Sequence, residues 1–167
     1  LLAAKVLQQR NRKDIKLVLI GDGKLKASLV NDAQRDSLTN IIFLDPVKKS
    51  KLALLMNRAD VGMQLLANIP AFYYGTSPNK FFDYIASGLP ILNNYPGWLA
   101  DMITEHNLGL AIKPDNPESF ADALEWFADN KVQLPKMSQA ASNLAKNEFD
   151  RSKLADCFVD WIERWSK

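Results

Sequence analysis

The sequence predicts an α/β domain in which helices cover both faces of a mostly parallel sheet, a three-layer sandwich that ends in helices alone. Short runs of Val, Ile and Leu alternate with amphipathic stretches over the first two-thirds of the chain. This alternation favours parallel strands joined by right-handed helical connections. After residue 112 the apolar spacing is helical throughout. The length of 167 residues is that of one domain, residues 1–167.

Several short apolar segments have the composition of strands. The first is a nearly continuous Val/Ile/Leu run that ends at Gly21 and Gly23, which is typical of a parallel strand buried on both faces. A long connection, residues 67–77, follows the third strand. The five predicted strands are residues 14–20, 41–44, 60–66, 90–92 and 109–112.

Helices are expected between these strands and after the last one. The predicted helices are the opening segment 1–7, then 24–37, 51–58, 78–87, a helix ending at about 105, then 117–129, 136–148 and 152–165. The last helix carries one apolar stripe, which predicts a core or interface position. Its members are Leu154, Cys157, Phe158, Trp161, Ile162 and Trp165.

The composition excludes several classes of function. Apolar residues make up 47% of the chain and charged residues 24%, which is typical of a globular domain. A formal charge of +2 with scattered basic residues argues against a nucleic-acid partner. No apolar run is long enough to span a membrane. The single cysteine, Cys157, excludes an internal disulfide and fits a reducing compartment such as the cytoplasm.

The segment Thr76 to Lys80 has the signals of a helix start that binds an anion. Ser77 is a suitable N-cap, Pro78 suits the first turn, and Gly88 suits the helix end. Free amides and hydroxyls at such a start, together with the helix dipole, favour a phosphate. Lys80 has the wrong charge for the dipole, and an anion would remove that conflict. A plain N-cap with a solvated lysine explains this segment alone equally well.

Asp83 turns this anion site into a candidate nucleotide site. It lies on the same helix face as Asn79 and Lys80, and its side chain tilts toward the helix start. A carboxylate beside a phosphate site suggests hydrogen bonds from sugar hydroxyls, and phosphate plus ribose is a nucleotide pattern. The alternative is an ion pair between Lys80 and Asp83 within the helix.

Two further loops are expected at the same edge of the sheet, where the strands end. Gly21 and Gly23 permit close approach of a ligand to the backbone, although they lack the third glycine of a dinucleotide fingerprint. Leu44, Pro46 and Val47 follow the next strand and offer backbone groups to a base edge. For each loop a tight turn without a ligand is an equally good interpretation.

The succession of these segments resembles one enzyme family. The segments, in order, are Ile20–Gly23, Asn40–Leu44, Arg58–Val61, Ser77–Ile91, Gly109–Ile112 and Pro117–Phe120. This order is similar to the C-terminal domain of retaining GT-B glycosyltransferases (group 1, family four). The resemblance implies a Rossmann-like domain that forms one half of a GT-B enzyme and binds a nucleoside-diphosphate sugar.

The resemblance also implies a role for each candidate residue. The diphosphate would lie at Thr76, Ser77, Asn79 and Lys80, the ribose at Asp83, and the base near Gly21, Gly23, Leu44, Pro46 and Val47. Such enzymes retain the anomeric configuration and commonly use no metal or other cofactor. The sequence contains no Asp-x-Asp pair of the kind that binds a metal-diphosphate in the other glycosyltransferase fold.

The chain departs from the family pattern in three respects. The family has two Glu residues eight positions apart, and these fall on Asp83, which is one methylene shorter, and on Gly75, which has no side chain. The acid that would contact the sugar is therefore absent. The basic pair that grips the diphosphate belongs to a first strand expected upstream of Leu1. No catalytic residue can be named from this sequence.

These observations lead to a functional hypothesis. We expect the donor-binding half of a transferase that passes a sugar to a glycan or lipid-linked acceptor in bacterial polysaccharide biosynthesis. The opening residues read as the middle of a helix, so we expect the chain to be a fragment. We expect the fragment to be inactive alone and to work together with the N-terminal domain of the same protein. We expect a cytoplasmic location, and a lipid-linked acceptor leaves open a peripheral association with the inner face of the membrane. The alternatives are a non-catalytic nucleotide- or partner-binding module and half of a sugar-nucleotide epimerase.

Overall fold

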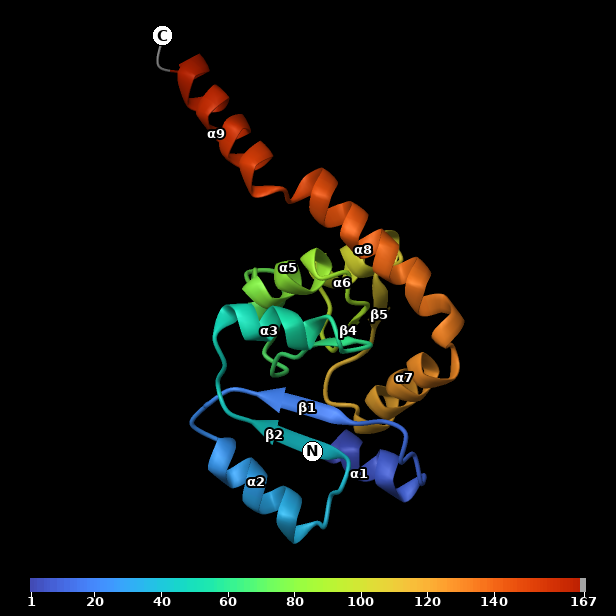
Figure 1. Cartoon of the computed structure of the whole chain (residues 1–167). Coiled ribbons are helices and arrows are strands. Elements are labelled where there is room, and N and C mark those ends of the chain that lie inside the picture. Colours follow the sequence, from blue (N-terminus) through green and yellow to red (C-terminus); the bar gives the residue numbers. More distant parts are fainter. Residues whose placement is uncertain (166–167) are drawn as a thin grey trace.

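The computed structural model describes residues 1–165 and confirms the predicted α/β class. Helices and parallel strands alternate as far as β5, and helices alone follow (Figure 1). The elements are α1 Leu2–Gln9, β1 Leu17–Ile20, α2 Lys26–Arg35, β2 Ile41–Leu44, α3 Lys49–Met56, β3 Gly62–Gln64, α4 Pro70–Tyr73, α5 Asn79–Ala86, β4 Ile91–Asn93, α6 Trp98–Glu105, β5 Gly109–Ala111, α7 Pro117–Asp129, the 3-10 turn η1 Lys131–Gln133, α8 Leu134–Glu148 and α9 Arg151–Trp165. The short helix α4 lies inside the predicted connection 67–77 and was not expected.

The strands form two parallel sheets where one sheet was expected. In the described part of the chain β1 pairs with β2, while β3, β4 and β5 pair in that order. Figure 1 shows the β1–β2 pair lying apart from the other strands. The prediction of a single sheet was wrong. β1 pairs only with β2 and β3 pairs only with β4, and no strand among residues 1–165 joins the free edges of β1 and β3 into one sheet.

The first strand is not buried on both faces as predicted. Leu17 and Ile41 pair with each other and pack into the core with α1. Val18 and Ile42 also pair, and because side chains alternate along a strand they point to the opposite face. They are 43% and 42% exposed. The apolar run therefore covers a core on one face only.

The second sheet is the middle layer of the sandwich. Ile91 and Leu92 of β4 are both fully buried, and they point to opposite faces of the strand. Ile91 packs in a cluster with Phe81 and Ile85 of α5 and with residues of α6 and α8. Leu92 packs in a separate cluster with α1 and α7. Burial on both faces is what the Val/Ile/Leu composition of a parallel strand predicts.

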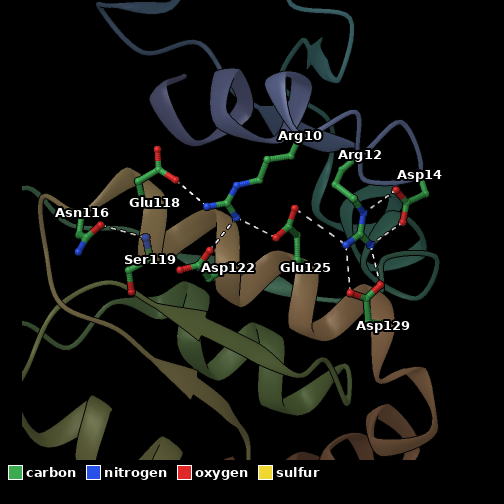
Figure 2. A network of polar contacts seen from close by, with 9 residues as sticks. All are labelled: Arg10, Arg12, Asp14, Asn116, Glu118, Ser119, Asp122, Glu125 and Asp129. Atoms are coloured by element: carbon green, nitrogen blue, oxygen red, sulfur yellow. Dashed lines mark hydrogen bonds and ion pairs between the residues drawn. The ribbon is translucent and has the colours of Figure 1, made fainter.

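The opening helix is attached to α7 by a network of ion pairs (Figure 2). Arg10 contacts Glu118, Asp122 and Glu125, and Arg12 contacts Asp14 and Asp129. The Arg12 guanidinium hydrogen-bonds Asp14 and lowers the pKa of that carboxyl to about 2. Because these groups lie at the surface, the network fixes the orientation of α1 more than it adds to the free energy of unfolding.

The last helix does not join the core. Figure 1 shows α9 projecting away from the rest of the domain. Its apolar stripe is exposed, from 43% at Ile162 to 78% at Trp165, and Cys157 is a free, exposed thiol. The prediction that this stripe packs in the core was therefore wrong. The other prediction, that it forms an interface, stays a prediction. None of the helices within residues 1–165 combines the length and apolar character needed to cross a membrane.

Candidate functional site

Two helices lie side by side at the edge where the parallel strands end. Lys49 Nζ, at the start of α3, lies 3.7 Å from Asp83 Oδ1, in the middle of α5. Near their ends, Ser87 Oγ donates to Met56 Sδ at 3.6 Å. The two helices therefore run in the same direction, and both point their N-termini toward the carboxyl ends of β2 and β3. This is the edge at which α/β sheets bind ligands.

The start of α5 differs by one residue from the sequence prediction. The helix begins at Asn79, and Pro78 occupies the N-cap position with extended backbone angles (φ −76°, ψ 128°). The expected N-cap role of Ser77 was therefore wrong, and α5 has no side-chain cap and no acid in its first turn. Because Phe81 N–H donates to Pro78 O at 3.0 Å, the amides of Asn79 and Lys80 remain for a ligand.

The inner face of α5 fixes the direction in which Asp83 points. Phe81 and Ile85 are fully buried. The Tyr84 ring packs directly on Gly62 of β3, where an added Cβ would lie 2.6 Å from the ring, and its hydroxyl donates to Met63 O at 3.2 Å. Burial and the charge of Asp83 raise the pKa of Tyr84. Asp83 itself is held half-buried beside α3 with its side chain 36% exposed.

The connection between β3 and α5 is held at both ends by side chains of the β4–α6 segment. Asn94 accepts from Leu66 N–H at 2.8 Å and donates to Leu66 O at 3.0 Å, which fixes the exit from β3. Tyr73 stacks on Tyr95 with ring centroids 6.3 Å apart. These contacts place the segment that precedes α5 and so determine where a ligand at the helix start would lie.

Thr76 differs from the other predicted diphosphate residues. Its hydroxyl donates to Phe72 O, and its carbonyl accepts from Trp98 Nε1 at 3.1 Å. The hydroxyl proton is therefore engaged within the chain. Ser77, Asn79 and Lys80 are exposed, and no side-chain hydrogen bond joins them to any residue in the range 1–165. These three groups are the ones available to an anion.

Asp83 forms an ion pair, but not with the residue expected from helix spacing. Its partner among residues 1–165 is Lys49, and Lys80 lies beyond 4.0 Å. The alternative of an internal Lys80–Asp83 pair was therefore wrong. Lys49 was not predicted as a site residue from the sequence. The available signal was a run of basic residues, from Lys48 onward, that begins a helix directly after a strand-end loop, the same signal that selected Lys80.

The glycine loop and the end of β2 border a hollow of about 560 Å³. Its lining includes Gly23, Lys26 and Asp45. Lys26 Nζ lies 2.6 Å from Asp45 Oδ1 and 3.3 Å from Leu44 O, and it lowers the pKa of Asp45 through this hydrogen bond. The Leu44 carbonyl also accepts from Gly21 N–H at 3.2 Å. This backbone acceptor is thus already used within the chain.

The other residues predicted to lie near the nucleotide base differ in how they relate to this hollow. An added Cβ at Gly21 or Gly23 would meet no atom within 4 Å, so both backbone positions are open to a ligand. Pro46 is exposed and Val47 is half-buried, and neither lines the hollow. Lys26 and Asp45 were not selected from the sequence. Within residues 1–165, no three His, Cys, Asp or Glu side chains lie close enough together to hold a metal ion.

Gly75 is not required by the backbone. An added Cβ there would meet the Ala71 carbonyl at 3.7 Å, an ordinary contact. A Cβ is thus sterically allowed at this position, just before the start of α5, so the backbone conformation does not account for the missing acid.

Comparison with known families identifies the domain. The sequence pattern of the family described as Glycosyl transferases group 1 matches residues 1–147. The chain belongs to the group 1 glycosyltransferases. The glycosyltransferase domain has the fold of the C-terminal half of GT-B enzymes: it superposes on HepE of Anabaena bound to UDP-glucose with a TM-score of 0.78 at 14% identity, over 97% of this chain and 44% of HepE.

Two further glycosyltransferases are similar to this domain. It is 28% identical over 130 residues to the D-rhamnosyltransferase WbpZ of Pseudomonas aeruginosa, which covers 77% of this chain and 33% of WbpZ. It also superposes with a TM-score of 0.66 at 20% identity on WaaG, a glycosyltransferase involved in lipopolysaccharide biosynthesis, over 87% of this chain and 38% of WaaG. The chain therefore spans about a third to under a half of the length of these relatives.

Proposed function

We propose that this chain is the donor-binding half of a retaining glycosyltransferase that uses a nucleoside-diphosphate sugar. The observation that carries the proposal is the placement of Asp83. Its half-buried carboxylate lies one helical turn from the free amides of Asn79 and Lys80 and faces the start of α3. A ribose at the carboxylate would place the attached diphosphate at the helix start, where amides and the helix dipole stabilise it.

The other candidate residues have consistent roles in this proposal. Ser77, Asn79 and Lys80 supply exposed donors to the diphosphate, and Thr76 shapes the segment through its internal hydrogen bonds. Gly21 and Gly23 leave open backbone beside the end of β2, so the base lies near them and near Leu44, Pro46 and Val47. No metal or other cofactor is required by this arrangement, because amides and lysine ammonium groups balance the diphosphate charge.

The relatives support a hexose donor and a bacterial surface glycan as the product. One relative is named a D-rhamnosyltransferase, one structure contains UDP-glucose, and one enzyme acts in lipopolysaccharide biosynthesis. We propose a hexosyl or deoxyhexosyl donor and a glycan or lipid-linked acceptor. An acceptor of this kind is consistent with a cytoplasmic enzyme working at the inner face of the membrane.

We further propose that another part of the protein completes both the sheet and the active site. The relatives matched by this chain are more than twice its length. The edges of β1 and β3 that pair with no strand among residues 1–165 are where an additional parallel strand would pair. Transfer needs an acceptor held against the donor and shielded from water in a cleft between two domains. We therefore expect the chain alone to bind nucleotide without transferring sugar, and measurable transfer by residues 1–167 would overturn this expectation.

The central test is a nucleotide titration of the Asp83→Asn variant followed by amide chemical shifts. Wild-type amides from residue 76 to residue 83 should shift with UDP or GDP. The variant should bind about tenfold or more weakly, since a hydrogen bond to a charged group contributes about 1.5–3 kcal/mol. Asp101→Asn, which removes the first-turn acid of α6, is the matched control and should bind normally. Shifts confined to other regions at millimolar nucleotide would refute the proposal.

Gly75 favours a second candidate function, a nucleotide-binding module without catalysis. The acid expected to contact the sugar is absent, although an added Cβ at Gly75 would make only an ordinary contact. The two functions differ in sugar transfer. A donor site supports transfer from a nucleoside-diphosphate sugar in the full protein, whereas a nucleotide module binds the nucleotide and supports no transfer.

A further inference from the structure

Lys49 is a cation at the proposed donor site that the sequence analysis did not select. It is the first residue of α3, its side chain is 87% exposed, and its Nζ lies 3.7 Å from Asp83 Oδ1. This separation exceeds an ordinary N–H···O hydrogen bond, so the ion pair is loose. A loose, exposed pair between a flexible lysine and the proposed ribose acid can open when a ligand takes the carboxylate.

The surroundings of Lys49 leave its charge available. The first turn of α3 contains no acid, and Asp83 is the ion-pair partner of Lys49 among residues 1–165. Lys26, another lysine near the end of β2, is occupied by Leu44 O and Asp45. A lysine at a helix N-terminus is unfavourable by itself because the helix dipole repels it. A bound anion would relieve this repulsion, as proposed for Lys80 at the start of α5.

We infer that Lys49 binds the diphosphate of the donor, an inference that rests on the proposed function of Asp83. In a nucleoside diphosphate the ribose and the first phosphate are separated by a single methylene and an ester oxygen. A ribose that donates its hydroxyls to Asp83 therefore holds its phosphates within reach of a lysine that already touches the same carboxylate. Lys49 neutralises Asp83 in the free protein and moves to the phosphate oxygens when the nucleotide binds.

This exchange gives the site two ammonium groups from different helices. Lys80 approaches the diphosphate from the first turn of α5, and Lys49 approaches from the first residue of α3. Ammonium–phosphate contacts are charge-assisted hydrogen bonds, which are stronger than those between neutral groups. Two positive side chains also offset the repulsion between the diphosphate and the carboxylate of Asp83.

The test compares a nucleoside with its diphosphate, because the two differ only in the group that Lys49 is inferred to bind. Affinities of the 167-residue chain for uridine, guanosine, UDP and GDP are measured by calorimetry at two salt concentrations. Lys49→Ala should weaken diphosphate binding about tenfold and reduce its salt dependence, while changing nucleoside affinity less than about twofold. Lys51→Ala removes an exposed lysine of the same helix and should leave every affinity unchanged.

The outcomes separate this inference from the proposed function. If Asp83→Asn weakens binding and Lys49→Ala does not, Lys49 is a bystander and the inference falls alone. If Lys49→Ala strengthens nucleoside and diphosphate binding equally, Lys49 only competes for Asp83, and the inference is again wrong. If the wild-type chain binds none of the four ligands, both proposals are overturned. Because Lys49 is exposed, we expect its variant to fold normally, and its thermal midpoint verifies this.

Discussion

Gly97 offers the sharpest test of how the site is positioned. It precedes α6 with φ 121° and ψ −175°, a backbone conformation that is essentially restricted to glycine. An added Cβ would lie 2.4 Å from the carbonyl oxygen of Tyr73. Tyr73 is buried and stacked on Tyr95, so its backbone cannot move without disturbing the buried ring. Alanine at this position therefore combines backbone strain with a steric clash.

The magnitude follows from these two contributions. The disallowed backbone conformation costs about 1–3 kcal/mol. Displacing packed atoms costs about another 1–3 kcal/mol, which makes the total roughly 2–6 kcal/mol. For a chain of this size each kcal/mol lowers the thermal midpoint by about 2–4 °C, so Gly97→Ala should lower it by about 12 °C at the middle of the range.

The assay is thermal unfolding followed by circular dichroism, with Gly75→Ala as the matched control. Gly75 lies in the connection between β3 and α5, two residues after Tyr73, and an added Cβ there meets only the Ala71 carbonyl at 3.7 Å. The control should therefore unfold within about 2 °C of the wild type. Trp98, which follows Gly97, donates to Thr76 O at 3.1 Å. Gly97→Ala should therefore also weaken nucleotide binding at temperatures well below the variant's thermal midpoint, where the variant is folded. A midpoint within about 2 °C of the wild type for Gly97→Ala would refute the reasoning.

Two further predictions concern pH. Burial and Asp83 raise the pKa of Tyr84, so the stability that its neutral form contributes is present below about pH 10 and lost as pH rises through the raised value. Tyr84→Phe should flatten this alkaline loss in the thermal midpoint, whereas Tyr74→Phe, at a 72% exposed ring, should leave it unchanged. Arg12 holds the pKa of Asp14 at about 2, so the contribution of this carboxylate is full above its unfolded value of about 3.9 and is lost as pH falls through about 2. Urea midpoints of Arg12→Ala should therefore depend less on pH between about 4 and 2 than those of the wild type, and an equal dependence would contradict the assignment.

Much of the fold was accessible from the sequence because its signals are local. All five strands lie inside or within one residue of the predicted segments, since apolar runs and turn residues mark them. The position of Asp83 on the helix, one turn after the start, follows from the helical repeat alone. The start of α5 differed by one residue because Ser77 and Pro78 both suit a helix start, and only the backbone conformation distinguishes them.

The sequence by itself determined the α/β class, the family and the helix that carries Asn79, Lys80 and Asp83, since these depend on residues close together in the chain. Only the tertiary structure decided that the strands form two sheets, that α9 is exposed, and that Asp83 pairs with Lys49 and not with Lys80. Each of these depends on which distant segments pack together. A contact between the start of α3 and the middle of α5 leaves no periodic pattern in the sequence, because packing in three dimensions creates it.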